Sequence, residues 1–266
     1  SYLHSKGYNV SIIDANNFRR SKDFFDRIKT ELDDALCAGL SVMSAQIPDA
    51  LEIAKSIRAF NASLPLIWGG IHPTLYPGQT AQDSLVDFVV KGEGEITTLE
   101  LVEAIEGRRD FRQVKGIAFL PNSGHEVVVN PDRELMDIEA LPPIEWNLLE
   151  NVRNNGMAGI VGSTIYEGGI PVQTSRGCPH HCAFCINTVL RSKYRYRQPA
   201  SVLDDIKELV DSGVNRIYFM DENFFVNRRR LTEILDGIEK HQLVFKWFAN
   251  VRVDYFREDY ITRGLL

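Results

Sequence analysis

Apolar and polar positions along the chain follow two periods, one typical of short buried strands and the other of amphipathic helices. In the first 110 residues, short apolar runs predict strands at 9–13, 38–43, 64–68 and 87–90. Apolar residues at helical spacing predict helices at about 24–36, 49–60 and 95–106.

This alternation of strands and helices predicts an α/β domain over residues 1–110, with a Rossmann-like parallel sheet covered on both faces. Ligands of such sheets bind beyond the carboxyl ends of the strands. In this chain the loops 41–44, 69–74 and 92–95 follow those ends. We therefore expect a ligand site at these three loops.

A different pattern occupies residues 111–165. Two β-prone runs, 116–120 and 125–130, flank a turn sequence at 121–124, which is typical of a hairpin. An extended strap containing Leu-Pro-Pro follows at 138–150, and the stretch at 151–169, rich in Gly and Asn, is expected to be loop. We expect 111–165 to form a hairpin and a linker between two domains.

Residues 166–266 return to strand–helix alternation. Strands are expected at 170–175, 215–220 and 244–250, and helices at 201–212, capped by Ser201, at 229–240, and from Asp254 onward. Strands that each lead into a helix, with polar groups at the strand ends, are typical of (β/α) barrels. This half of the chain therefore predicts the first part of a barrel.

The composition narrows the classes of function. A net charge of −6 at pH 7 argues against general affinity for nucleic acid, and no apolar run approaches the length of a membrane span. Residues 1–6 lack the apolar core of a signal peptide. Together with clustered free thiols, these features predict a protein of the reducing cytoplasm.

Three of the four cysteines, Cys178, Cys182 and Cys185, lie within eight positions. A small buried hydrophobe does not need this spacing, so the pattern indicates a metal site. Three thiolates can bind three irons of a 4Fe–4S cluster and leave the fourth iron open to a substrate or cofactor. The sequence thus predicts a cluster that takes part in chemistry.

The spacing C-x3-C-x2-C, with Phe184 before the last cysteine and Arg-Gly before the first, resembles the signature of the radical S-adenosylmethionine (SAM) enzymes. The resemblance implies that the open iron binds the amino and carboxylate groups of SAM. One electron then cleaves SAM into methionine and a 5′-deoxyadenosyl radical, and Phe184 lies against the adenine. An electron donor such as a flavodoxin or ferredoxin is implied.

Two other interpretations of the cysteines stay open. A zinc site could take His180 or His181 as its fourth ligand, although structural zinc usually draws a second cysteine pair from a distant segment, which this chain lacks. A disulfide would leave an odd thiol among the three cysteines.

The loops of the first half resemble, in their order, the cobalamin-binding domain that precedes the radical SAM domain in one large subfamily. Ser41-Val42-Met43 matches a small-residue turn under the corrin tail, and Gly69-Gly70 matches a double glycine. Glycines let the backbone approach a bulky nucleotide tail, and a small hydroxyl can hydrogen-bond it. The residues implied as cobalamin contacts are Ser41, Ser44, Gly69, Gly70, Thr74 and Glu93.

Two further interpretations belong to this domain. It could be a Rossmann-like domain that binds nothing. His72 invites a role as cobalt ligand, but a histidine beside a proline is more often an ordinary loop residue, and the ligating histidine of the family follows the first strand. The chain is expected to begin after that strand, so we do not assign the ligand to His72.

Asp221 and Glu222 follow the strand at 215–220, where the radical SAM family places polar groups that bind the SAM amino group. A carboxylate suits a cationic ammonium, so we expect these two residues to contact SAM, with Glu222 preferred. The simpler interpretation is a helix cap.

The basic and aromatic residues at 191–197 are expected to form either a lid with solvated arginines or an RNA-binding strip. The three arginines at 228–230 are expected to form a solvated helix start.

Taken together, the chain resembles a cobalamin-dependent radical SAM enzyme with a small-molecule substrate. The expected fold is a Rossmann-like cobalamin-binding domain (1–110), a hairpin and linker (111–165), and the first half of a partial (β/α)6 barrel (166–266). The family implies methyl transfer from methylcobalamin to an unactivated centre. Oxidative cyclisation or rearrangement, RNA modification, and a non-catalytic iron–sulfur module are the alternatives; no catalytic acid or base can be named.

Overall fold

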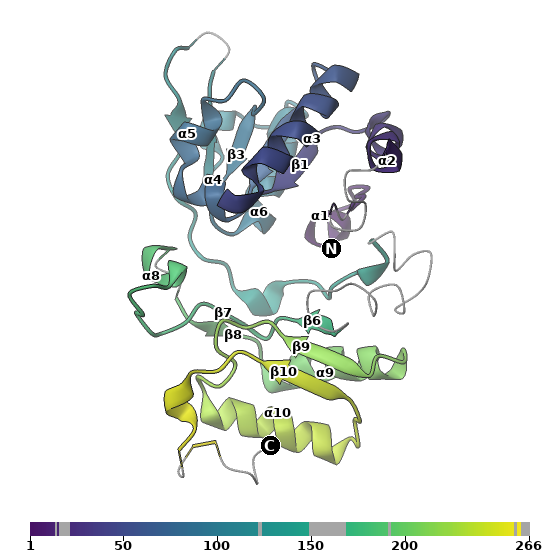
Figure 1. Ribbon diagram of the computed structural model, residues 1–266, viewed down its shortest axis with the longest axis vertical. Coiled ribbons are helices and arrows are strands. Elements are labelled where there is room, and N and C mark those ends of the chain that lie inside the picture. The colour runs from purple at the N-terminus through teal and green to yellow at the C-terminus, as the bar shows by residue number, and fades with distance from the viewer. Residues whose placement is uncertain are drawn as a thin grey trace. The chain divides into compact units, whose positions relative to one another are not determined.

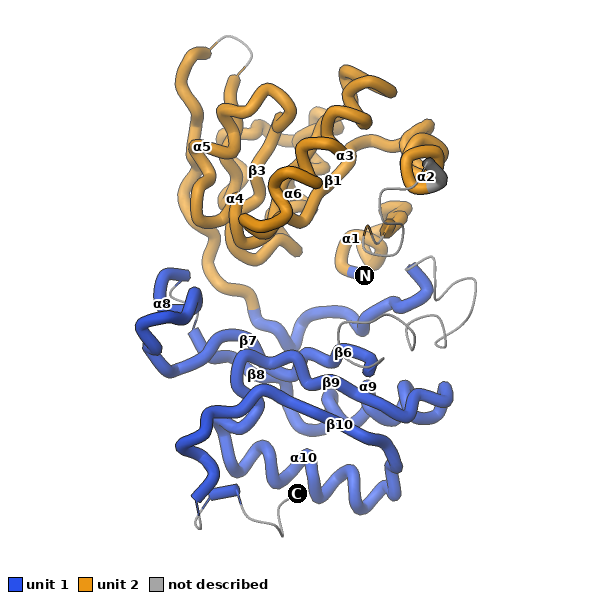
Figure 2. The backbone as a smooth tube through the Cα atoms, in the orientation of Figure 1, with its two compact units in different colours: residues 1, 137–266 blue, residues 2–136 orange. Residues whose placement is uncertain are grey.

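The computed structural model describes residues 1–13, 15, 22–121, 124–148, 169–190, 193–257 and 260–261, and every structural statement below concerns these. The chain forms two compact units, one of Tyr2–Met136 and one of Ser1 with Asp137–Leu266 (Figure 2). None of the described helices combines the length and the apolar character that a membrane crossing requires.

The first unit is built on a five-stranded sheet in the order β1-β2-β3-β4-β5 (Figure 1). The first three strands are parallel, and the last two are antiparallel to their neighbours. The strands are β1 (Ala38–Ser41), β2 (Leu66–Gly69), β3 (Phe88–Val90), β4 (Ile117–Phe119) and β5 (Val128–Val129). The helices are α1 (Tyr2–Ser5), α2 (Lys22–Leu32), α3 (Ile47–Phe60), α4 (Ile71–Leu75), α5 (Pro77–Ala81) and α6 (Gly94–Ile105).

Both faces of this sheet are covered, as the sequence predicts. Successive side chains of a strand point to opposite faces, and β2 divides accordingly: Leu66 and Trp68 join one core cluster with residues of α2 and α3, while Ile67 joins another with residues of α6. β3 divides in the same way, with Val89 in the first cluster and Val90 in the second.

One prediction for this unit is wrong, and one pair of helices was not predicted. Residues 9–13 form no strand beyond an isolated bridge at Ile12, whose side chain is 39% exposed, because apolar character alone does not provide a pairing partner. The connection from β2 to β3 contains two short helices, α4 and α5, that the sequence pattern missed. Each has only five residues, too few for a helical period to show.

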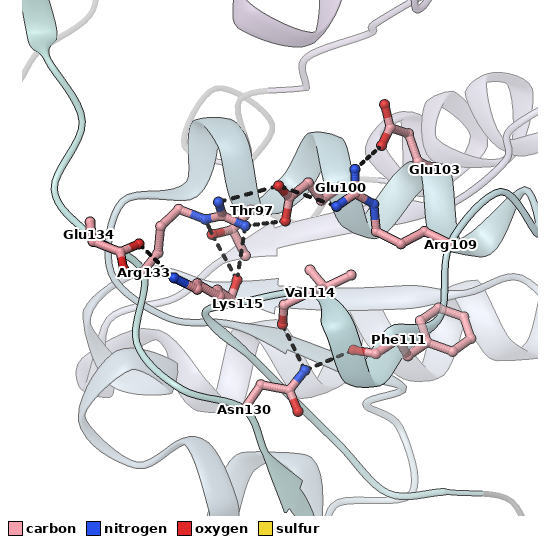
Figure 3. A network of polar contacts seen from close by, with 10 residues as sticks. All are labelled: Thr97, Glu100, Glu103, Arg109, Phe111, Val114, Lys115, Asn130, Arg133 and Glu134. Carbon is pink, nitrogen blue, oxygen red and sulfur yellow. Dashed lines mark hydrogen bonds and ion pairs between the residues drawn. The ribbon is translucent and has the colours of Figure 1, made fainter.

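The hairpin expected within the connector extends the first sheet, because β4 pairs with β3 and β5 with β4. Figure 3 shows the polar contacts that hold this region. Arg133 donates to Thr97 Oγ1 at 2.8 Å and pairs with Glu100 on α6, and the Asn130 side chain donates to the carbonyls of Phe111 and Val114, at 2.7 Å each. The boundaries at 110 and 165 stay a prediction.

The second unit contains a parallel three-stranded sheet in the order β10-β9-β6 (Figure 1). Helices α9 and α10 share its main core cluster, and a two-stranded antiparallel pair, β7 and β8, stands beside the cysteine loop. The elements are β6 (Ile170–Val172), β7 (Ser175–Arg176), α8 (Ile186–Leu190), β8 (Arg195–Tyr196), α9 (Pro199–Asp211), β9 (Arg216–Phe219), α10 (Arg228–Lys240) and β10 (Lys246–Ala249).

Some details of this unit differ from expectation. Ser201 does not cap α9, because the helix begins at Pro199 with Gln198 as the residue before it. The Ser201 hydroxyl instead donates to Glu139. The helix expected from Asp254 is a 3-10 turn, Val253–Tyr255, as far as the described residues extend. The loop expected at 151–169 lies, apart from its last residue, outside the described residues.

Candidate functional site

In the first unit, the loops after β1 and β2 are joined backbone to backbone. The amide of Val42 donates to the carbonyl of Gly69 at 2.8 Å, and the amide of His72 donates to the carbonyl of Val42 at 3.1 Å. Val42 is buried, whereas Ser41, Met43 and Ser44 beside it are exposed. The parallel strand ends therefore present small hydroxyl groups to solvent on a fixed backbone.

Gly70 is required at this junction for two reasons. Its φ of +97° lies in a region that L-residues with side chains rarely adopt. A Cβ at this position would also lie 2.8 Å from the amide nitrogen of Val42 and 2.9 Å from its carbonyl oxygen. Gly69 is not restricted in this way, since the nearest atom to its Cβ would be 3.7 Å away. The double glycine thus contains one position that no other residue fits.

Thr74 connects the β2 loop to the loop after β3. Its hydroxyl donates to the carbonyl of Gly70 at 2.7 Å and accepts from the amide of Gly92 at 3.0 Å. The Ser44 hydroxyl and the Nδ1 of His72 lie 3.1 Å apart. The structure therefore brings five of the six residues expected to contact cobalamin into one interlocked edge, and the sixth, Glu93, directly precedes α6 at that edge.

In the second unit, Gly177 sets the start of the cysteine loop. Its φ is +78°, and a Cβ there would overlap the carbonyl of Lys193, so the chain can turn from β7 toward Cys178 only with glycine. After the turn, the amide of Cys185 donates to the carbonyl of Cys182 at 2.9 Å, and Thr188 Oγ1 donates to the same carbonyl at 3.0 Å. The last two cysteines are thereby held at the start of α8.

The three cysteines of this loop fit a 4Fe–4S cluster in their chemistry. Cys178, Cys182 and Cys185 are all free thiols of intermediate burial, and a guanidinium lies beside one of them. Within the described ranges, no three His, Cys, Asp or Glu side chains gather closely enough to hold one metal ion. Cluster thiolates bind different irons, so they do not have to converge on a single point.

Asp221 is a fully buried anchor for the strand that leads into the cysteine loop. Its Oδ1 accepts from the amide of Thr174 at 2.6 Å, and its Oδ2 accepts from the hydroxyls of Thr174 and Ser175, at 2.5 and 2.6 Å. Both oxygens are thus engaged inside the protein. The expectation that Asp221 contacts SAM directly does not fit this geometry.

Glu222 is the exposed carboxylate at the same strand end. Its Oε2 accepts from the amide of Gly177 at 3.1 Å, so it lies next to the residue that precedes Cys178. Phe184, expected against the adenine, is 93% exposed, and its ring is available to a ligand. Of the two carboxylates, Glu222 is therefore the one that is exposed to solvent, and its contact with SAM stays a prediction.

The loop after β10 also reaches the cysteine loop, which the sequence did not indicate. Arg252 Nη1 donates to the sulfur of Cys182 at 3.0 Å, and Tyr255 Oη lies 2.7 Å from His180 Nε2. The hydrogen bonds that Arg252 donates to Asp254 raise the pKa of Arg252, so the guanidinium stays charged. Arg252 lies between two valines and belongs to no recognisable sequence motif. Only the fold, in which β10 pairs with β9, shows that Arg252 lies beside Cys182.

Of the helix start expected to be solvated, Arg228 and Arg229 are exposed as expected, but Arg230 is buried. Arg230 is 3% exposed; its Nε donates to the carbonyl of Arg197 at 2.9 Å and its Nη2 to that of Thr174 at 2.8 Å. Burial lowers the pKa of Arg230. Arg197 pairs with Asp205 on α9. These two arginines therefore brace the strand before the cysteines, while residues 191–192 of the predicted strip lie outside the described residues.

Two family models match separate parts of the chain. The family model of the B12 binding domain matches residues 1–102, and that of the radical SAM superfamily matches residues 172–259.

Curated relatives cover most of this chain. An uncharacterized methyltransferase of Pyrococcus horikoshii is 29% identical over 83% of the chain and 47% of its own length. The anaerobic magnesium-protoporphyrin IX monomethyl ester cyclase of Rubrivivax gelatinosus is 30% identical over 97% of the chain and 46% of its own length. The chain thus spans just under half the length of these relatives.

Solved structures share the fold at lower identity. The cobalamin-dependent SAM radical enzyme OxsB, with aqua-cobalamin and SAM bound, gives a TM-score of 0.71 at 22% identity, covering 89% of this chain and 34% of its own. The radical SAM methyltransferase TsrM of Kitasatospora setae, with cobalamin and a [4Fe–4S] cluster bound, gives 0.69 at 20% identity, covering 91% and 48%.

Proposed function

We propose that this chain, in which a B12-binding domain precedes a radical SAM domain, is part of a cobalamin-dependent radical SAM enzyme that transfers methyl groups. The observation that carries the proposal is the hydrogen bond of 3.1 Å between Gly177 and Glu222, which joins the cysteine loop to the carboxylate of the neighbouring strand end. Methyltransferases among the relatives and neighbours favour methyl transfer.

Cys178, Cys182 and Cys185 would hold the 4Fe–4S cluster, which when bound supplies the electron that cleaves SAM. Glu222 would accept a hydrogen bond from the SAM ammonium, because a carboxylate pairs well with a cation and this one is exposed beside the loop. Phe184 would cover the adenine. Asp221 would act through the strand that it anchors and not through SAM.

The interlocked edge of the first unit would hold the tail of cobalamin. Gly70 keeps the backbone of two loops in contact, and the exposed hydroxyls of Ser41 and Ser44 can hydrogen-bond a nucleotide tail. Gly69, Thr74 and Glu93 would line the same edge. We keep His72 out of the cobalt-ligand role, because the ligating histidine of the family follows the first strand of the domain, whereas His72 follows β2.

The setting of the enzyme follows from these cofactors. Partly exposed cluster thiolates are sensitive to oxidation, so we place the protein in the reducing cytoplasm. A low-potential electron donor, such as a flavodoxin or ferredoxin, would reduce the cluster. The substrate would be a small molecule.

The test uses the full-length protein, produced without oxygen and supplied with iron, sulfide and cobalamin. With dithionite and SAM, the wild type should form 5′-deoxyadenosine. Cys182→Ala should lose both the reducible cluster and this product. The matched control Cys37→Ala removes a thiol outside the motif and should keep both. A Cys182→Ala variant that retained both would contradict the assignment.

Oxidative cyclisation is a second candidate, because the Rubrivivax gelatinosus relative with this activity in its name matches 97% of the chain. SAM labelled in its methyl group separates the two reactions. A methyltransferase should release S-adenosylhomocysteine in addition to 5′-deoxyadenosine and place the label in its product. A cyclase should release 5′-deoxyadenosine without S-adenosylhomocysteine, and its methionine should keep the whole label.

A further inference from the structure

The loop that follows β10 contacts the cysteine loop through two side chains. Arg252 and Tyr255 come from this loop, and they contact Cys182 and His180 respectively. The N–H···S distance from Arg252 Nη1 to Cys182 Sγ is 3.0 Å, short for a hydrogen bond to sulfur. Two segments about 70 residues apart in the sequence thus meet at one of the three thiols.

The guanidinium of Arg252 is oriented by Asp254. Nε donates to Asp254 Oδ1 at 2.9 Å and Nη2 donates to Oδ2 at 3.0 Å, which leaves Nη1 directed at the sulfur. Arginine suits this arrangement because its donors lie in one rigid plane. A lysine ammonium in the same place would keep the charge but could not make both contacts in a fixed plane.

We propose that Arg252 is a positioning residue that raises the reduction potential of the cluster bound by Cys182. This inference rests on the proposed function, since it needs the cluster. Reduction adds one electron from the external donor, and no bond to Arg252 forms or breaks. The reduced cluster carries one more negative charge, so a cationic N–H donor at its thiolate stabilises the reduced form more than the oxidised form.

The position of Arg252 gives it a consequence that a merely structural residue would not have. Tyr255 is its natural comparison, because it holds the same two loops together through His180 but carries no positive charge to place at the Cys182 thiolate. If the loop only braced the fold, loss of either residue would have similar effects. If the N–H···S contact sets the potential, only loss of Arg252 shifts it.

The experiment is a redox titration of the full-length protein, followed by electron paramagnetic resonance of the reduced cluster. At the midpoint potential of the wild type, the ratio of reduced to oxidised cluster should be about tenfold lower in Arg252→Gln. This corresponds to a midpoint potential lowered by about 59 mV for one electron. Arg252→Lys should lie between the two. Tyr255→Phe should stay within about twofold of wild type, and so should Arg229→Gln, which removes an exposed arginine of α10.

An Arg252→Gln cluster that titrates like wild type would overturn the inference, and so would a Tyr255→Phe shift of equal size. If Arg252→Gln fails to retain a cluster, Arg252→Lys carries the test, and a wild-type potential there would also overturn it. A wild-type protein without any reducible cluster would instead contradict the proposed function itself. The two failures are therefore distinguishable.

Discussion

The two strand-end sites of this chain are built from different parts of the polypeptide. In the first unit, backbone hydrogen bonds join the loops after β1 and β2: Val42 bonds Gly69 and His72, and the surroundings of Gly70 leave no space for a side chain. In the second unit, buried side chains make them, with Asp221 and Arg230 both bonded to the segment before the cysteines.

The difference follows from what each site has to hold. A backbone edge made of small residues is fixed and lets a large cofactor tail come close to the chain. A cysteine loop must hold several thiolates at set positions, and a loop has no regular hydrogen bonding of its own. Buried side chains from neighbouring strands therefore supply its rigidity.

The largest effect is expected from Gly70→Ala in the backbone-built site. The positive φ and the overlap with Val42 should together lower the free energy of unfolding by about 2–5 kcal/mol and abolish corrinoid binding. The matched control is Gly78→Ala on α5, where a Cβ meets no atom within 4 Å. Chemical denaturation and corrinoid content measure both. A Gly70→Ala protein that retained corrinoid would show that this edge is not the site.

A smaller effect, divided between two residues, is expected in the side-chain-built site. Asp221→Asn should lower the unfolding free energy by about 1–3 kcal/mol, because buried donors of Thr174 and Ser175 lose a charged acceptor. Glu222→Gln should leave stability within about 0.5 kcal/mol and weaken SAM binding. Denaturation curves and calorimetry with SAM separate the two. If the two variants lost equal stability, the assignment of Asp221 as an anchor and Glu222 as a ligand contact would be wrong.

The smallest effect concerns Cys37, the thiol outside both sites. Burial raises the pKa of Cys37 above its ordinary value, so the folded state holds the thiol proton more tightly. Its contribution to stability is therefore present at neutral pH and is lost as the pH rises above the ordinary thiol pKa. In apoprotein treated with iodoacetamide at pH 8, Cys37 should label more slowly than the three clustered cysteines. The extent of labelling at each cysteine is measured by mass spectrometry. Equal rates at all four cysteines would contradict the prediction that Cys37 is protected by burial.

The contrast between the two sites also explains what could be predicted from the sequence. The alternation of strands and helices, the parallel sheet and the cysteine spacing depend on local patterns, and Gly69-Gly70 is visible as a pair. Arg252 and Arg230 could not be assigned, because their partners lie in other strands and only the fold brings them together. Asp221 and Glu222 are adjacent in the sequence, yet only burial distinguishes the anchor from the exposed carboxylate.

The most direct measurement is the visible spectrum of the full-length protein, produced without oxygen in the presence of cobalamin and desalted. The account predicts a corrinoid spectrum at close to one per chain together with absorbance of an iron–sulfur cluster that dithionite bleaches. An iron–sulfur spectrum without corrinoid would contradict cobalamin-dependent methyl transfer and leave the first unit as a scaffold or substrate-binding domain.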